Sequence, residues 1–100
     1  MEQEFELIAG CEGVRNEIRE ADRLTQSGAY DGAEDALKRA EELKRELHAL
    51  QTSLIGEWEG SMTPLVAHAM DHVFSFDLEI GAARRFNELA RRIDRLERNG

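Results

Sequence analysis

The chain has 100 residues, of which 41% are hydrophobic and 34% are charged, a balance typical of one globular domain rather than of a disordered segment. Its net charge of −8 argues against a general nucleic-acid binder and against a protein that binds anionic membranes, because both of those surfaces are negative. No apolar run approaches the length of a membrane span and no signal segment opens the chain, so we expect a cytoplasmic protein.

The first predicted helix covers about residues 3–26, where an apolar residue recurs at every third or fourth position. Ser27 and Gly28 follow it, and glycine tolerates the left-handed conformation that often ends a helix. Cys11, the one cysteine of the chain, falls on the apolar face and is predicted to be a small core residue. It cannot form an intrachain disulfide, which suits a reducing cytosol. The apolar face consists of Leu7, Cys11, Val14, Ile18 and Ala21.

The second predicted helix has the most regular pattern in the chain. Its apolar residues alternate in steps of three and four, so they share one stripe of a helix with about 3.6 residues per turn. Asp31 and Glu34 have the spacing of a capping box at its start. Such a long stripe needs partner helices to bury it, which predicts a helical bundle. The stripe consists of Tyr30, Ala33, Leu37, Ala40, Leu43, Leu47, Leu50 and Leu54.

A turn and a new helix start are predicted after this stripe. Gly56 and Gly60 bracket the turn, which contains Trp58. Thr63 and Pro64 have the residue types of an N-cap and of the first helical position, where the missing N–H of proline costs nothing. The third predicted helix runs from there to about residue 80.

Gly81 interrupts the apolar pattern, and a fourth predicted helix covers residues 82–100. These residues include six arginines and three acidic residues, whereas residues 1–81 hold 18 acidic and seven basic residues. We expect the basic helix to pack beside acidic ones and to complement the negative end of its own dipole. A phosphate or nucleic-acid site on the six arginines is the alternative.

The predicted fold is all-α, a single domain over residues 1–100 that forms an antiparallel up-down four-helix bundle. The short connections favour antiparallel neighbours, and no segment has a strand pattern. The predicted core consists of Leu37, Leu43, Leu47, Leu50, Val14, Ile18, Val66, Val73, Phe76, Phe86 and Leu89.

The third predicted helix is apolar over about half of its circumference, because Met70, Phe74 and Leu78 form a second ridge beside its first stripe. Such a helix is either central in the bundle or partly reserved for a partner. Asp77 falls within the apolar sector, so its carboxylate needs a partner or a place at the edge of the bundle.

His68 and His72 stand four residues apart on the polar face of this helix, as two metal ligands would. A zinc site needs a further good ligand, which the helix does not supply, so we predict two solvated histidines and no metal. Asp71 is not expected to pair with His72, because adjacent helical positions point about a hundred degrees apart. There is no glycine-rich phosphate loop and no nucleophile elbow. We therefore predict no catalytic residue, no cofactor and no enzyme.

Three motifs stand at compatible spacing along residues 5–98. The first is FELIAGCEG at residues 5–13, the second is GAYDGAEDALKRA at residues 28–40, and the third extends over residues 47–73. They are similar, in this order, to the L-E-L-I … Y-D-G, G-D-Y-x-x-A-x-x-A-L-x-K-A and E-L-x-x-S-L … G-G … L-x-x-L-Y-D-Y-M motifs of the FliS family. The chain therefore resembles the flagellin-export chaperones, although it lacks their N-terminal extension and has Cys11 and Met70 in place of tyrosines.

This resemblance implies a cytosolic bacterial chaperone that binds the disordered C-terminal segment of flagellin, or of a related axial protein, and prevents premature polymerisation. Export-apparatus components are the further partners that it implies. It implies no cofactor, no metal, no nucleic acid and no membrane insertion. The candidate client groove consists of Ile8, Met70, Phe74, Asp77 and Leu78.

Two other functions are compatible with the sequence. A generic helical adaptor would dimerise through its apolar third helix and ignore disordered peptides. Trp58 and Gly60 also form a Trp-x-Gly motif, which occurs in the turn of small secreted helical-hairpin proteins. That family is a two-helix hairpin, whereas a further helix boundary is predicted here at residues 27–28.

Overall fold

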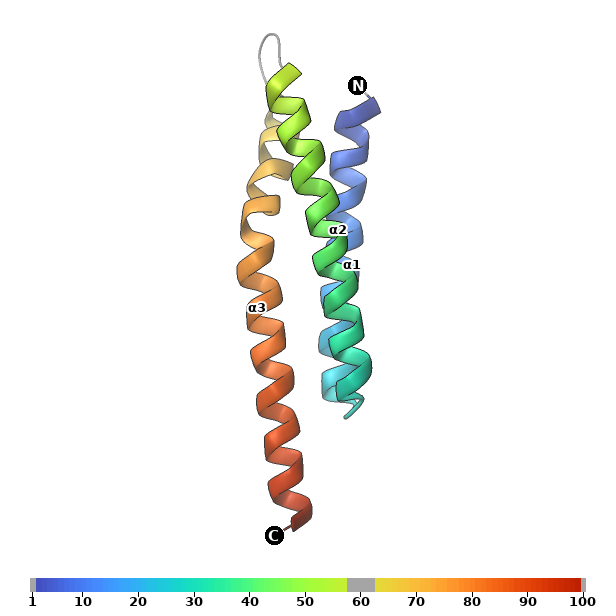
Figure 1. Ribbon diagram of the computed structural model, residues 1–100, viewed down its shortest axis with the longest axis vertical. Helices are drawn as coiled ribbons and strands as arrows, with labels where there is room; N and C mark the ends of the chain where they lie inside the picture. Colours follow the sequence, from blue (N-terminus) through green and yellow to red (C-terminus); the bar gives the residue numbers. More distant parts are fainter. Residues whose placement is uncertain (1, 58–62, 100) are drawn as a thin grey trace.

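The computed structural model describes residues 2–57 and 63–99, which form three helices: α1 (Glu2–Gln26), α2 (Tyr30–Glu57) and α3 (Pro64–Asn99). Figure 1 shows α1 and α2 joined at one end, with α3 running back beside them, and the bundle measures 62 × 18 × 17 Å. The described residues contain no strand, so the all-α prediction is confirmed. Among them, no helix is both long and apolar enough to cross a membrane.

The predicted fourth helix is not a separate element, because α3 continues through Gly81 as one helix with a total length of 36 residues. A glycine weakens a helix by about 1 kcal/mol relative to alanine, which packing on either side can outweigh. Ile80 and Ala83 are both buried in the core and provide this packing. The prediction of four helices was therefore wrong for the part of the chain that the structure describes. Gly56 likewise lies within α2, while Trp58 and Gly60 lie outside the described residues.

The core follows the apolar stripes of the three helices. Six of the predicted core residues are buried and three are partly buried against them. The predictions for Phe86 and Leu89 were wrong, since these side chains are 44% and 58% exposed. The reason is the orientation of this part of α3. Ala83 and Asn87 form its buried face, with Asn87 bonded to Thr25 and Tyr30 at the α1–α2 turn, so Phe86 and Leu89 lie outside that face. The buried six are Val14, Leu37, Leu47, Val66, Val73 and Phe76, and the partly buried three are Ile18, Leu43 and Leu50.

The turn between α1 and α2 is built around Gly28, whose φ is +84°. This left-handed conformation is costly for residues with a Cβ, and it lets the amides of Gly28 and Ala29 donate back to the carbonyls of Thr25 and Leu24 at 3.1 and 2.8 Å. The helix end predicted from Gly28 is confirmed.

A buried polar link ties this turn to α3. The Thr25 hydroxyl donates to the side-chain oxygen of Asn87 at 2.9 Å, and the Asn87 amide donates to the Tyr30 carbonyl at 3.0 Å. Thr25 and Asn87 are only 3% and 4% exposed, so each needs the other as a partner. This link fixes the register of α3 against the α1–α2 turn.

The predicted capping box of α2 does not form. The Ala33 amide donates to the Ala29 carbonyl at 3.0 Å, which places the N-cap at Ala29, before Asp31. Asp31 instead pairs with Arg91, and Glu34 pairs with Arg84. At the start of α3 the prediction is confirmed, because the Thr63 hydroxyl accepts from the Val66 amide at 3.2 Å.

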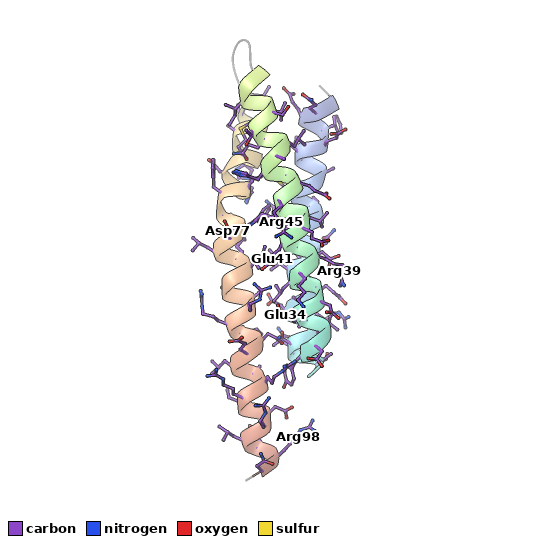
Figure 2. All side chains as sticks on the ribbon, viewed as in Figure 1. Glu34, Arg39, Glu41, Arg45, Asp77 and Arg98 are labelled. Atoms are coloured by element: carbon purple, nitrogen blue, oxygen red, sulfur yellow. The ribbon has the colours of Figure 1, made fainter. Side chains whose placement is uncertain are left out.

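The basic end of α3 packs beside acidic residues of α2, as expected. Arg84 contacts Glu34 at 2.9 Å and Glu41 at 2.5 Å, and Arg91 pairs with Asp31. Figure 2 shows Glu34 and Glu41 on the side of α2 toward α3. Both carboxylates raise the pKa of Arg84, which therefore stays charged. The arrangement favours the structural interpretation of the arginines over a separate anion site.

Gly10 of α1 lies directly against Leu47 of α2. A Cβ built on Gly10 would lie 2.2 Å from Cδ2 of the buried Leu47, whereas one on Gly13 would lie 3.7 Å from its nearest neighbour. We expect Gly10→Ala to lower the free energy of unfolding by about 1 kcal/mol, since overpacking outweighs the better helix propensity of alanine. Gly13→Ala, the control, should raise it by about 0.5–1 kcal/mol. Urea melts test both, and equal stabilisation by the two variants would contradict this view of the interface.

Candidate functional site

The most distinctive polar feature of the structure is a pair of histidines on α3. The Nε2 atoms of His68 and His72 lie 2.9 Å apart, with ring centroids at 4.4 Å and ring planes at 89°. The spacing of four residues places both on the same face of the helix. The two rings therefore share a hydrogen bond, which the prediction of two independently solvated histidines missed.

The two rings differ in how firmly the fold holds them. His72 is half-buried and stacks on Phe76, with ring centroids 6.4 Å apart and planes at 24°. Phe76 is fully buried, so it is a fixed support for the His72 ring. His68 is exposed to solvent. A molecule approaching from outside can therefore reach His68, while His72 stays in place behind it.

A cavity of about 210 Å³ lies between α1 and this face of α3. On the α1 side, Arg15 donates to Glu12 at 2.8 Å, and the Arg15 side chain is 26% exposed. Cys11 lies deeper, with its thiol 3.5 Å from the carbonyl oxygen of Ala69. Burial raises the pKa of Cys11 and outweighs the opposite effect of Arg15, so the thiol stays protonated and unreactive. The lining residues are Ile8, Cys11, Glu12, Arg15, His68, Ala69 and His72.

This cavity combines a nucleophile with a cation. A neutral imidazole has a ring nitrogen with a free lone pair and is a nucleophile in covalent catalysis. A guanidinium presents five N–H donors that suit the oxygens of a carboxylate or phosphate. Within residues 2–57 and 63–99, no three His, Cys, Asp or Glu side chains come together as metal ligands would. The cavity is therefore suited to covalent chemistry on an anionic group.

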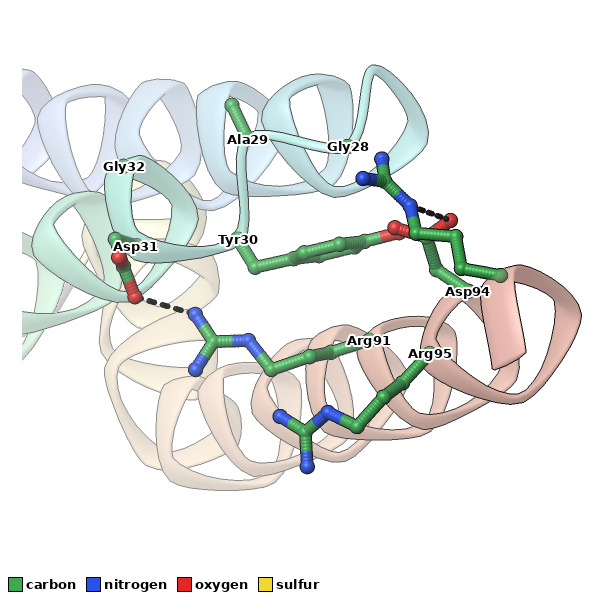
Figure 3. A pocket seen from close by; sticks show the side chains of 9 residues that line it. Gly28, Ala29, Tyr30, Asp31, Gly32, Arg91, Asp94 and Arg95 are labelled. Carbon is green, nitrogen blue, oxygen red and sulfur yellow. Dashed lines mark hydrogen bonds and ion pairs between the residues drawn. The ribbon is translucent and has the colours of Figure 1, made fainter.

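A larger cavity of about 600 Å³ lies at the other end of the bundle. Its lining is less suited to covalent chemistry on an anionic group. Figure 3 shows Arg91 against Asp31 and the Tyr30 ring between α2 and α3. The Arg91 guanidinium lies 5.6 Å from the centre of that ring, and Asp94 accepts from Arg98 at 3.2 Å. Two of the three arginines there are thus already paired with carboxylates, and the described lining residues include no histidine or cysteine.

The five residues predicted as a client groove do not form one surface. Ile8 lines the histidine cavity, and Met70 is buried, whereas Phe74 and Leu78 are 65% and 75% exposed. Asp77 lies at the edge of the bundle and pairs with Lys44, as the sequence required of a carboxylate in that sector (Figure 2). Phe74 and Asp77 line a separate cavity with Lys44, Arg45, His48 and Val73.

Comparison with known proteins identifies what the chain resembles. The family model described as "PTS system, Lactose/Cellobiose specific IIA subunit" matches residues 2–91. The lactose-specific EIIA component of the PTS of Streptococcus mutans is 29% identical over 92 residues, which cover 88% of each chain. No solved structure matches the chain.

These matches overturn the resemblance to flagellin-export chaperones. The predicted flagellin client, the export-apparatus partners and the chaperone function were therefore wrong, and the generic helical adaptor is not favoured either. The three motifs consist largely of leucine, alanine and charged residues at helical spacing. Any amphipathic helix needs that pattern, so it occurs in unrelated bundles. The secreted hairpin does not fit, because the described residues form three helices.

The two histidines were visible in the sequence, where they were considered as metal ligands and His72 was considered as a partner of Asp71. Arg15 and Glu12 were missed, since these lie on another helix, far away in the sequence. The available signal was the spacing of His68 and His72 on a polar face.

Proposed function

Because the chain belongs to the family of lactose/cellobiose-specific IIA subunits of the PTS, we propose that it is a phosphocarrier that takes up a phosphoryl group on the histidine pair of α3. The single observation that supports this assignment to the pair is the 2.9 Å contact between the Nε2 atoms of His68 and His72 in a cavity that also contains Arg15. A phosphoryl carrier needs a reachable nucleophile, a donor beside it and positive charge, and this cavity holds all three.

His68 is the proposed nucleophile and His72 the supporting donor. A hydrogen bond between two neutral imidazoles requires one ring to donate and the other to accept. His72 is fixed on Phe76, so it is assigned as the Nε2–H donor, and the exposed His68 as the acceptor with its lone pair on Nε2. Once Nε2 of His68 carries the phosphoryl group, the His72 N–H is placed to donate to a phosphoryl oxygen.

The proposed reaction exchanges one P–N bond for another. Nε2 of His68 attacks the phosphorus of a phosphohistidine on the donor protein, and the bond from phosphorus to the donor ring breaks as the new bond forms. The His68 ring loses the proton on Nδ1 and the donor ring takes up one, by way of the water that reaches the exposed site. The transition state is largely dissociative, so the protein contributes mainly position and charge.

The partners follow from this role. We expect a phosphohistidine protein of the HPr type as the donor and a IIB component as the recipient, and we propose that the exchange takes place in the cytoplasm. The names of the family and of the S. mutans relative point to lactose or cellobiose as the sugar that finally receives the phosphoryl group. The protein is a carrier that leaves each half-reaction modified, rather than an enzyme in the usual sense.

Phosphoramidate, a small P–N donor, tests the proposal on the purified protein. We expect the intact mass to increase by one phosphoryl group that is lost in acid and kept in base, as for a phosphohistidine. The label should map to the peptide that contains His68 and His72. His48, the remaining histidine of the chain, is the internal control, since it is exposed on α2 and has no ring partner among the residues that the structure describes.

Two results would contradict the proposal. One is labelling of His48 to the same extent as the pair, which would show that the pair has no special reactivity. The other is a chain that takes no phosphoryl group from either phosphoramidate or phosphorylated HPr.

A further inference from the structure

A phosphohistidine brings two negative charges to a place that is already acidic. The chain has a net charge of −8, and Glu12 lines the cavity while the exposed Asp71 stands between the two histidines in the sequence. Phosphoryl oxygens are stabilised by fixed cations and N–H donors in a site that excludes part of the water. Some group must therefore offset this charge.

Arg15 is the one lysine or arginine among the described residues that line the histidine cavity. Its charge acts inside the cavity, since it lowers the pKa of Cys11 against the stronger effect of burial. Its side chain is 26% exposed, and Glu12 fixes the guanidinium through one N–H at 2.8 Å. Four of the five N–H donors remain without a side-chain partner among the described residues, so the guanidinium has donors to offer a second anion.

We propose that Arg15 binds the phosphoryl group carried by His68, reaching across from α1 while Glu12 holds its guanidinium. This inference rests on the proposed function of the histidine pair. Arg15 forms charge-assisted hydrogen bonds to the phosphoryl oxygens, both in the transition state and in the phosphorylated protein. Arg15 is thus the binding residue for the transferred group, and His72 of α3 is the second donor.

Glu12 has the opposite effect on the phosphoryl group. Its carboxylate orients Arg15, but it also repels a dianion and competes for the same guanidinium. Removing the charge of Glu12 should therefore favour the phosphorylated state, whereas removing that of Arg15 should disfavour it. A merely structural salt bridge would respond in the same direction to the loss of either partner.

The test measures the rate of phosphorylation by phosphoramidate and follows the 31P signal of the phosphorylated protein against pH. Arg15→Gln should slow phosphorylation by about tenfold, as expected for a lost charge-assisted hydrogen bond. It should also raise the pKa of the phosphoryl group, because the dianion loses a cation. Arg15→Lys should recover part of both effects. Glu12→Gln should lower that pKa and speed phosphorylation.

Arg23→Gln is the matched control. Arg23 pairs with Glu20 at 2.6 Å on the same helix, with the same spacing of three residues, and lies outside the histidine cavity. This variant should leave the rate and the 31P titration unchanged, and circular dichroism should show that all variants fold.

The outcomes separate the two proposals. A wild-type protein that is not labelled at His68 or His72 would overturn the proposed function and the role of Arg15 with it. A labelled wild type with an Arg15→Gln variant that keeps both its rate and its 31P midpoint would overturn the role of Arg15 alone. Equal effects of Arg15→Gln and Arg23→Gln would do the same.

Discussion

Replacing His68 with alanine is expected to lower the rate of phosphoryl uptake to below about a thousandth of the wild-type rate, because the variant has no nucleophile at the reachable position. His72 cannot substitute for it, since its ring is half-buried and stacked on Phe76. The fold should not change, because His68 is exposed and its side-chain hydrogen bond is with His72, on the same helix.

Variants of His72 test the other half of the pair. His72→Ala removes the N–H that supports the phosphoryl group and should slow uptake by about tenfold. His72→Gln retains an N–H donor on a side chain of similar reach and should recover most of the rate. Phosphorylation is measured by intact mass at fixed times with phosphoramidate. A His72→Ala variant that loses all activity, with His68→Ala still active, would reverse the assignment of the two roles.

Replacing Phe76 with alanine is expected to cost about 3–5 kcal/mol of the free energy of unfolding. Phe76 is fully buried, and it is the largest of the fully buried side chains of the described core. Its loss leaves a cavity in the core between α3 and the other helices, which the surrounding side chains can fill only in part.

Phe74→Ala is the control, because it deletes the same side chain two residues away on the same helix. Phe74 is 65% exposed, so we expect a change within about 0.5 kcal/mol. Urea denaturation followed by circular dichroism measures both. Similar losses for the two variants would show that α3 is rotated relative to the arrangement described here.

The Phe76 variant also links the core to the site. The His72 ring stacks on Phe76, so the fraction of Phe76→Ala that remains folded should take up phosphoryl groups more slowly than wild type. This effect should resemble that of His72→Ala, since both leave the His72 donor out of position. Phosphorylation at a low temperature, where the variant is folded, provides the measurement.

Local chemistry made much of the fold predictable from the sequence. Gly28 ends α1 because it can adopt a positive φ, and Thr63 caps α3 because its hydroxyl accepts an amide of the first turn. The apolar stripe of α2 gave its buried face, including Leu37 and Leu47. Each of these features depends on residues within one or two turns of each other, which is the range over which spacing rules hold.

Contacts between helices decided the rest. Gly81 does not break α3, because Ile80 and Ala83 are packed against the core, and Leu89 is exposed because α3 turns Asn87, not Leu89, toward the α1–α2 turn. Both outcomes depend on which helix lies opposite, and no local pattern contains that information.

The candidate site shows the same division. The sequence by itself determined that His68 and His72 share one face of a helix, since a spacing of four residues requires it. Only the tertiary structure placed Arg15 and Glu12 of α1 beside them. The physical reason is that a helix fixes its own faces through its backbone, whereas the packing of whole helices determines what each face meets.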